Sequence, residues 1–265
     1  MHRFFISEKD IFDGTFKIVG PALHHIRNVL RLGKGDTLIL LDGLGTEYKG
    51  VITFAERDGV VGKIFDVRAS DSEPSVEVIL AQGLPKGEKL DLVVRMCTEI
   101  GVSEIIPMVT QRSLPRFKDS QRTRKHERWQ RIAEEAAKQC RRGKIPKIRE
   151  LCSFTDLIKE ASSQGTLAFM AWESAHSSQG LHELLESRRS HSRRVYIIIG
   201  PEGGFSEEEA SFAESLGISM LSLGRRILRT ETAGVVAVSL ILYELGDLGG
   251  KKLHYEESSL SHPGL

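Results

Sequence analysis

Two glycine-containing segments in the last third of the chain carry the residues best suited to hold a ligand. The first reads Gly-Pro-Glu-Gly-Gly-Phe (200–205) after the apolar run Ile197–Ile199, and the second reads Leu-Gly-Arg-Arg-Ile-Leu-Arg-Thr-Glu-Thr (223–232). Glycines have no side chain, so the backbone can come close to a bound molecule. Each segment is expected to link a strand to a helix. Two such loops side by side in an α/β sheet favour a nucleotide-like ligand.

The common nucleotide motifs are absent. No Gly-x-Gly-x-x-Gly follows the first of these strands, and the chain has no Gly-x-x-x-x-Gly-Lys-Ser/Thr. Ser206 and Glu209 have the spacing of a capping box, which predicts that a helix begins there. One glycine-rich loop alone is often only a tight turn, whereas two favour a binding site.

Charge is distributed unevenly along the chain of 265 residues, which is long enough for one large or two modest domains. The formal net charge is +1, so no global field draws the protein to nucleic acid. Residues 112–131 nevertheless hold eight Lys or Arg against Asp119 and Glu127, and residues 138–149 hold six more and no acid. Such clusters are typical of a polyanion partner. A solvated helix face is the alternative, and the commoner one for a charge run alone.

Cysteine usage and hydropathy indicate the compartment. Cys97, Cys140 and Cys152 are odd in number and lack the CxxC spacing, so we expect neither a disulfide framework nor a zinc site. The first residues include charges and no apolar signal region. The longest apolar stretch, Val235–Tyr243, is too short to span a bilayer. We expect a soluble protein of the reducing cytoplasm, without metal or membrane association.

The N-terminal part is expected to be mostly β. Asp-Gly pairs give turn signals between short strands, and a helical segment begins at Pro21 and stops at Gly33. Closely spaced short strands suggest a small barrel, and the polar segment Ala69–Pro74 suggests a linker. The predicted strands are Thr37–Leu41, Glu47–Phe54 and Val60–Val67.

After the linker, strands and helices alternate, which predicts an α/β domain with parallel strands. A helix with Leu90, Val93, Val94, Cys97 and Ile100 on one face is expected to end at Gly101. A longer helix carries Trp129, Ala133 and Ala137 on one face. The last helix, Thr230–Leu245, is apolar nearly all round and should be buried in the core or against a second subunit. The predicted strands are Val76–Gln82, Glu104–Val109, Leu167–Trp172, Val195–Ile199 and Met220–Leu223.

Together the two glycine-containing segments closely resemble those of the ribosomal RNA small subunit methyltransferase E family, which belongs to the SPOUT class. The resemblance extends over about residues 1–246 of the chain. The resemblance implies S-adenosylmethionine as cofactor and a homodimer formed through the C-terminal domain. It also implies a PUA-like RNA-binding β-barrel at residues 1–72 and a flexible tail at residues 251–265. Between them, residues 73–250 would form a SPOUT-type trefoil-knotted parallel sheet with helices on both faces.

The resemblance implies which residues hold the cofactor, largely through backbone groups. Glu173 would hold the ribose hydroxyls, although an exposed loop carboxylate is an equal alternative. Phe205 would form a wall for the target base or belong to the core. The implied cofactor-binding residues are Trp172, Glu173, Ile199, Gly200, Pro201, Glu202, Gly203, Gly204, Leu223, Gly224, Ile227 and Leu228.

The reaction implied is methylation of N3 of a specific uridine in 16S ribosomal RNA. The enzyme must align the nucleophile with the methyl group. It must also remove the N3 proton. Arg229 would stabilise charge on the uracil oxygens, and Glu231 would accept the proton or orient Arg229. Alternatively, the segment only caps the last helix, with Thr230 as N-cap and Glu231 complementing the helix dipole.

The segment from His24 to Arg31 resembles the family's N-terminal signature and would place Arg27 and Arg31 on one helix face. Basic side chains there would hold phosphates of the RNA. Ordinary surface or packing histidines are the alternative. The predicted RNA-binding residues are His24, His25, Arg27, Arg31, Lys86, Lys89, Arg112 and Arg116.

Other functions remain open at this point. The substrate would be 16S ribosomal RNA itself or the small ribosomal subunit. A SPOUT methyltransferase that acts on another RNA or on ribose 2′-O is one rival. A catalytically inactive RNA-binding ribosome-assembly factor is another. A nicotinamide-dependent enzyme is disfavoured because its dinucleotide fingerprint is absent.

Overall fold

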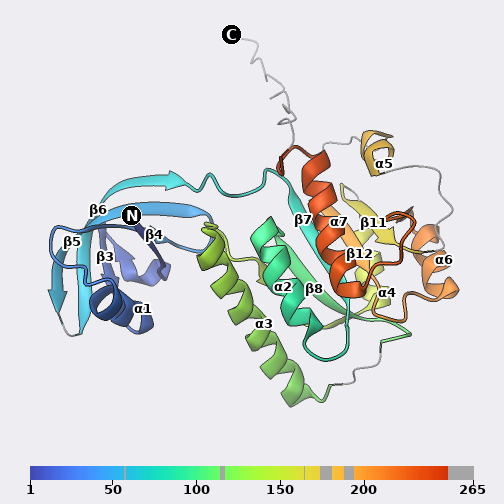
Figure 1. Ribbon diagram of the computed structural model, residues 1–265, viewed down its shortest axis with the longest axis horizontal. Helices are drawn as coiled ribbons and strands as arrows, with labels where there is room; N and C mark the ends of the chain where they lie inside the picture. Colours follow the sequence, from blue (N-terminus) through green and yellow to red (C-terminus); the bar gives the residue numbers. More distant parts are fainter. Residues whose placement is uncertain (57, 114–116, 164, 174–180, 188–193, 250–265) are drawn as a thin grey trace, which may run out of the picture.

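The computed structural model describes residues 1–56, 58–113, 117–163, 165–173, 181–187 and 194–249. Two sheets lie at opposite ends of the molecule, and the long strand β6 (Gly59–Ala69) leads from the first toward the second (Figure 1). Each sheet has its own apolar core. The predicted tail, residues 251–265, falls outside the described residues.

The N-terminal sheet has six strands in the order β1-β4-β5-β6-β3-β2. All neighbours are antiparallel except β1 and β4. This confirms the mostly β prediction for this part, although the three short strands that come first in the chain had no individual prediction. The strands are β1 (His2–Phe5), β2 (Ile11–Phe12), β3 (Thr15–Ile18), β4 (Thr37–Leu41), β5 (Thr46–Glu56) and β6 (Gly59–Ala69), with a 3₁₀ turn, η1 (Glu8–Asp10), between β1 and β2.

Phe16 fills the centre of this sheet's core and is 1% exposed. Gly50 on β5 and Gly62 on β6 leave room for its ring, because a Cβ atom would come within 2.5 Å of it at the first position and 2.3 Å at the second. Either contact is far too close for carbon atoms, so both strands need glycine where they face the ring.

The predicted helix between Pro21 and Gly33 is shorter than expected. It consists of α1 (Pro21–His24) and a π-helical turn, η2 (His25–Val29). Arg31 lies beyond the helix with φ +54°, in the left-handed region. The prediction that Arg27 and Arg31 share one face of a regular helix is therefore wrong, because the helix ends before Arg31.

The second sheet is parallel throughout, with seven strands in the order β10-β8-β7-β12-β11-β13 and β9 paired to β8. The predicted strands are confirmed within one or two residues at each end. The strands are β7 (Glu77–Gly83), β8 (Glu104–Val109), β9 (Lys147–Ile148), β10 (Cys152–Ser153), β11 (Leu167–Ala171), β12 (Arg194–Ile199) and β13 (Ser219–Leu221).

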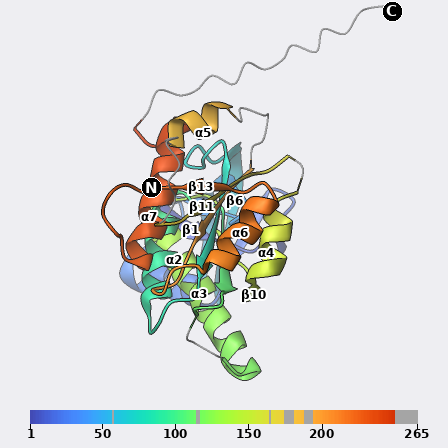
Figure 2. The ribbon, with the colours of Figure 1, turned by 90° about the vertical axis from the view of Figure 1, so that its right-hand side faces the viewer.

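Helices cover both faces of the parallel sheet (Figure 2). Successive residues of the central strands alternate between the two cores: Ile197 packs on the side of α2, α3 and α7, and Ile198 on the side of α4 and α6. Both faces are buried, which explains the nearly continuous apolar runs of the strands. The helices are α2 (Lys89–Ile100), α3 (Asp119–Cys140), α4 (Phe154–Ala161), α5 (Leu181–Ser187), α6 (Glu207–Ser215) and α7 (Thr230–Glu244).

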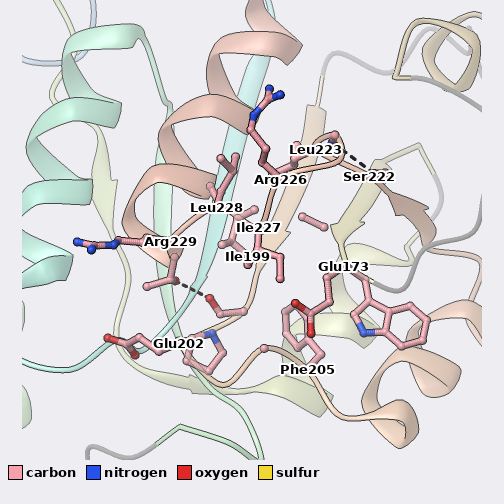
Figure 3. Close-up of a pocket in the computed structure, with 18 of the residues that line it drawn as sticks. Glu173, Ile199, Glu202, Phe205, Ser222, Leu223, Arg226, Ile227, Leu228 and Arg229 are labelled. Carbon is pink, nitrogen blue, oxygen red and sulfur yellow. Dashed lines mark hydrogen bonds between the residues drawn. The ribbon is translucent and has the colours of Figure 1, made fainter.

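The end of the chain returns from the edge of the sheet to its centre. After the edge strand β13, residues 222–229 lead back to α7, which contacts β7, β12 and α2. This return brings the second glycine-containing segment beside the first, at the carboxyl ends of the central strands (Figure 3). The trefoil knot implied by the resemblance stays a prediction.

A buried ion pair fixes the segment that links the two sheets. Glu73, in the segment between β6 and β7, accepts hydrogen bonds from Arg142 and from the backbone N–H groups of Gly143 and Lys144, at 2.8 to 2.9 Å. The guanidinium of Arg142 also donates to the carbonyl oxygens of Thr98 and Val102. Since Arg142 and Glu73 are both almost fully buried, this ion pair fixes the linker against α2 and the end of α3.

Candidate active site

A cavity of about 630 Å³ opens at the carboxyl ends of β11, β12 and β13 (Figure 3). Its walls include the ends of β11 and β12, the residues that follow Ala171, Ile199 and Leu221, and side chains of α2 and α7. The carboxyl edge of a parallel sheet is where α/β proteins bind ligands. The volume lies in the range of roughly 300–1,000 Å³ that is common for small-molecule sites.

The cavity brings together most of the predicted cofactor-binding residues. Gly203 does not line it: its carbonyl oxygen accepts a hydrogen bond from Arg112 at 2.9 Å, and a Cβ there would lie 3.1 Å from the Arg112 Cβ. The predicted residues that line it are Trp172, Glu173, Ile199, Gly200, Pro201, Glu202, Gly204, Leu223, Gly224, Ile227 and Leu228. The lining also includes Lys89, Ala171, Phe205, Ser222, Arg225, Arg226, Arg229, Thr230 and Ala233.

Two glycines leave space in the cavity wall for a ligand. Gly204 has φ +66° and Gly224 has φ +107°, a region that favours glycine. A Cβ at either position would meet no other protein atom within 4 Å. The room that side chains would occupy therefore stays open, in a cavity that apolar Leu223 and the carboxylate-bearing Glu173 also line. This set of groups fits an adenosyl compound, with backbone and apolar contacts for the base and a carboxylate for hydroxyl groups.

A buried polar chain fixes the first glycine-containing segment. The Gln82 side-chain amide, at the end of β7, donates to Thr230 Oγ1 at 2.8 Å, and Thr230 Oγ1 donates to the Gly200 carbonyl oxygen at 2.5 Å. Gly83 lets the segment approach β7, because a Cβ there would lie 2.6 Å from the Pro201 nitrogen. Residues from three distant parts of the chain thus set the position of the cavity wall.

Arg229 and Glu231, the predicted catalytic residues, occupy different places. Arg229 lines the cavity and takes the N-cap position of α7, so the alternative that Thr230 is the N-cap is wrong; Thr230 is the first helical residue. Glu231 lies behind the lining, with its side chain 14% exposed, and pairs with Lys89 Nζ at 3.4 Å. Its Oε2 atom has no closer partner among the described residues.

Lys89 also pairs with Glu202, at 2.9 Å between Nζ and Oε1. The hydrogen bond to Glu202, together with the charges of Glu202 and Glu231, raises the pKa of Lys89, although partial burial opposes this. Burial raises the pKa of Glu202, but the hydrogen bonds from Lys89 and from backbone N–H groups outweigh it, so this pKa lies below its usual range. Lys89, predicted to bind RNA, is therefore engaged by two carboxylates at the cavity.

The other predicted RNA-binding residues lie in two groups. In the N-terminal sheet, His24, His25 and Arg31 are exposed, and Arg27 donates to the Glu56 carbonyl oxygen at 2.9 Å. Near the cavity, Lys86 and Arg112 are exposed, and the Lys86 backbone N–H donates to Glu202. Arg116 lies outside the described residues. The RNA-binding role of these residues stays a prediction.

Part of the basic cluster has structural partners. Arg128 pairs with Glu88 and Asp91 of the neighbouring segment, in addition to the buried pair that Arg142 makes. Arg149 pairs with Glu104 and Glu160. Arg124 and Arg131 are exposed on α3. The charge runs therefore include both a solvated helix face and groups that hold the fold together.

The described residues contain neither a candidate metal site nor a candidate membrane span. No cluster of three or more His, Cys, Asp or Glu there could hold a metal ion. No helix in the described part of the chain is long and apolar enough to cross a membrane.

The chain matches known proteins along most of its length. Residues 72–242 match the RNA methyltransferase domain family, and residues 20–65 match the RNA methyltransferase PUA domain. Ribosomal RNA small subunit methyltransferase E of Bacillus subtilis is 33% identical over 94% of this chain and 99% of its own length. The Synechocystis protein with that description is 32% identical, over 91% and 77%.

A similar solved structure is a putative methyltransferase of Legionella pneumophila in complex with the bound cofactor SAM. It is 30% identical, with a TM-score of 0.76, and the match covers 91% of this chain and 96% of that one. The arrangement of a mostly antiparallel N-terminal sheet followed by a parallel sheet with helices is thus shared with an experimentally determined protein.

Proposed function

Because this chain belongs to the ribosomal RNA small subunit methyltransferase E family, we propose that it methylates N3 of one uridine in 16S ribosomal RNA. S-adenosylmethionine is the proposed methyl donor, as the related Legionella structure was solved with that cofactor bound. The observation that carries the proposal is the cavity itself. Two glycine-containing walls leave open space beside a cluster of charged side chains, where a donor and a base can meet.

The residues at the cavity have different roles in the proposed reaction. The bound cofactor supplies a methyl group on a positively charged sulfur, which keeps the bonding electron pair when the methyl group leaves. Gly200–Glu202, Gly204 and Leu223–Leu228 would hold that cofactor, with Glu173 at the ribose. Arg229 stabilises the negative charge that develops on the uracil oxygens. A carboxylate accepts the N3 proton; the sequence predicts Glu231 for this role or for orienting Arg229.

The N-terminal domain, residues 1–72, is proposed to hold the RNA through exposed and partly exposed basic side chains of α1 and the segment that follows it. His24, His25, Arg27 and Arg31 would contact phosphates and position the substrate without reading its sequence. With such a substrate, we propose that the enzyme acts in the cytoplasm.

We also propose a homodimer formed through α2 and α7. These helices pack side by side and expose Leu92, Met96, Leu240 and Tyr243, which are 36%, 36%, 39% and 56% exposed. An apolar face of this kind is typical of a surface that a second subunit covers. Sedimentation velocity of the wild type and of Leu240→Glu tests it, and a wild-type monomer at micromolar concentration would refute it.

The reaction is tested with purified protein, radiolabelled S-adenosylmethionine, and small ribosomal subunits or 16S ribosomal RNA from cells that lack the protein. Mass spectrometry of the labelled RNA should find one N3-methyluridine. A ribose 2′-O-methyl group, or label only in another RNA, would contradict the proposed acceptor. If calorimetry finds no cofactor binding with or without RNA, the protein is a binding factor and the proposal fails.

A further inference from the structure

Three charged side chains from distant parts of the chain meet at one edge of the cavity. Lys89 opens α2, Glu202 belongs to the first glycine-containing segment, and Glu231 lies in the first turn of α7. The Lys89 ammonium is 2.9 Å from Glu202 Oε1 and 3.4 Å from Glu231 Oε2. In Figure 3, Glu202 and Arg229 extend from the same side of the cavity, opposite Glu173.

We propose that Glu202 is the carboxylate that accepts the N3 proton of the target uridine, and that Lys89 is a positioning residue that holds Glu202 for this step. The proposal rests on the function proposed above. It assigns to Glu202 a side-chain role beyond that of a backbone contact in the cofactor site, and it replaces the predicted role of Lys89 as a phosphate contact.

The geometry favours Glu202 over Glu231 as the acceptor. Glu202 lines the cavity and its side chain is 30% exposed, whereas Glu231 does not line the cavity and is 14% exposed. One oxygen of Glu202 is anchored: Oε1 accepts from Lys89 Nζ at 2.9 Å and from the Lys86 backbone N–H at 3.1 Å. Among the other described residues, Oε2 has the longer contact with the Lys86 N–H, at 3.4 Å, so it is the oxygen better placed to take a proton.

The charges around Glu202 support an ionised carboxylate. Lys89 faces it from α2 and is shared with Glu231 of α7, while Arg229 lines the same cavity. Arg112 donates a hydrogen bond to the carbonyl oxygen of Gly203, the residue after Glu202. Burial alone would raise the pKa of Glu202, but the hydrogen bond from Lys89 and those from backbone N–H groups bring it below its usual range. Glu202 is therefore ionised at neutral pH, as a proton acceptor must be before the reaction, while its lowered pKa makes it a weaker base than a carboxylate with a pKa near 7.

In the proposed step, the proton moves from uracil N3 to Glu202. The N3–H bond of uracil breaks, its electron pair stays on N3, and a new O–H bond forms at Glu202 Oε2. The resulting negative charge on uracil spreads to its two carbonyl oxygens, where Arg229 can stabilise it. N3 then takes the methyl group in place of the proton, and Glu202 later releases its proton to water.

The test combines variants with a pH profile. We expect Glu202→Gln to lower turnover by about 10²-fold or more, the usual contribution of a general base, and to leave cofactor affinity nearly unchanged in calorimetry. Glu231→Gln should have a much smaller effect. Lys89→Met should move the acidic limb of the turnover profile to higher pH, because loss of the ammonium favours the protonated form of Glu202. Lys89→Arg should restore the limb toward its wild-type position.

A second measurement does not depend on turnover. In protein with ¹³C-labelled glutamate, the Glu202 carboxyl signal should titrate at higher pH in Lys89→Met than in the wild type. Lys86→Met is the matched comparison, because Lys86 lies three residues before Lys89 and bonds Glu202 through its backbone N–H. Loss of the Lys86 ammonium should raise the KM for RNA without moving the acidic limb.

Two outcomes overturn the inference. One is that Glu231→Gln abolishes turnover while Glu202→Gln retains it. The other is that Lys89→Met weakens RNA binding, leaves the acidic limb in place and leaves the Glu202 titration unchanged, as a phosphate contact would. Failure of the proposed function is distinct, since the wild type would then give no N3-methyluridine at any pH.

Discussion

Replacing Thr230 with valine should loosen the cavity wall, because the hydroxyl of Thr230 joins two buried groups. It accepts from the Gln82 amide at 2.8 Å and donates to the Gly200 carbonyl at 2.5 Å. Valine has nearly the same shape but makes neither bond. Gln82 would keep only longer contacts with the carbonyl oxygens of Gly83, at 3.3 Å, and Gly200, at 3.5 Å.

The size of the effect follows from burial. Gln82 is fully buried and Thr230 is 6% exposed, so water cannot replace the lost partner without a rearrangement. An unsatisfied buried group costs about 1–3 kcal/mol. With the longer contacts of Gln82 retained, we expect a loss of about 2 kcal/mol in the free energy of unfolding. For a protein of this size that corresponds to a fall in Tm of about 4–8 °C.

Thermal unfolding and calorimetric titration with S-adenosylmethionine measure the two consequences. The freed segment Gly200–Gly204 should bind cofactor about tenfold more weakly, which equals about 1.4 kcal/mol. Thr230→Ser is the control, since it keeps the hydroxyl and should retain most of the stability and affinity. Equal Tm and Kd values for the valine and serine variants would refute the role given to the hydroxyl.

Three further changes test other parts of the site. Gly83→Ala places a Cβ 2.6 Å from the Pro201 nitrogen; we expect about 1–3 kcal/mol of destabilisation in denaturant unfolding and weaker cofactor binding, and an unchanged Kd would contradict the close approach. Arg229→Ala should lower turnover by about 10²-fold or more, with little change in calorimetric cofactor affinity; equal losses of both would assign Arg229 to binding. Arg27→Ala combined with Arg31→Ala should weaken RNA binding and flatten its dependence on salt in filter-binding assays, and an unaltered salt slope would give the N-terminal domain another role.

Local signals predicted the elements that depend on neighbouring residues. Ser206 and Glu209 form the predicted capping box: Ser206 Oγ accepts from the Glu209 N–H at 3.2 Å, and Glu209 accepts from the Ser206 N–H at 3.0 Å. Gly101 ends α2 with φ +123°, a conformation suited to glycine. The glycine-containing segments follow strands as expected. In each case the residues that determine the structure lie within a few positions of one another.

Contacts between distant residues account for what the sequence did not predict. Arg27 and Arg31 have helical spacing, but the helix ends at Val29 in a π-turn whose Ile26 packs into the core of the N-terminal sheet. Lys89 looked like one of many basic residues near loop ends. Its partner Glu202 is 113 positions away. Helix propensity and residue spacing do not predict the contact between Lys89 and Glu202, because it depends on the order of the strands in the parallel sheet.

Ion pairs within the protein reduce the number of Lys and Arg side chains that are free to bind RNA. Arg128, Arg142 and Arg149 lie in the basic runs, yet each has a carboxylate partner and Arg142 is buried. Neutralised groups of this kind release few counterions from RNA, so they add little to the salt dependence of binding. The exposed Arg124 and Arg131 on α3 remain for that role. A net charge of +1 is thus compatible with an RNA substrate, because local exposure of cations, rather than their total, determines the contact with phosphates.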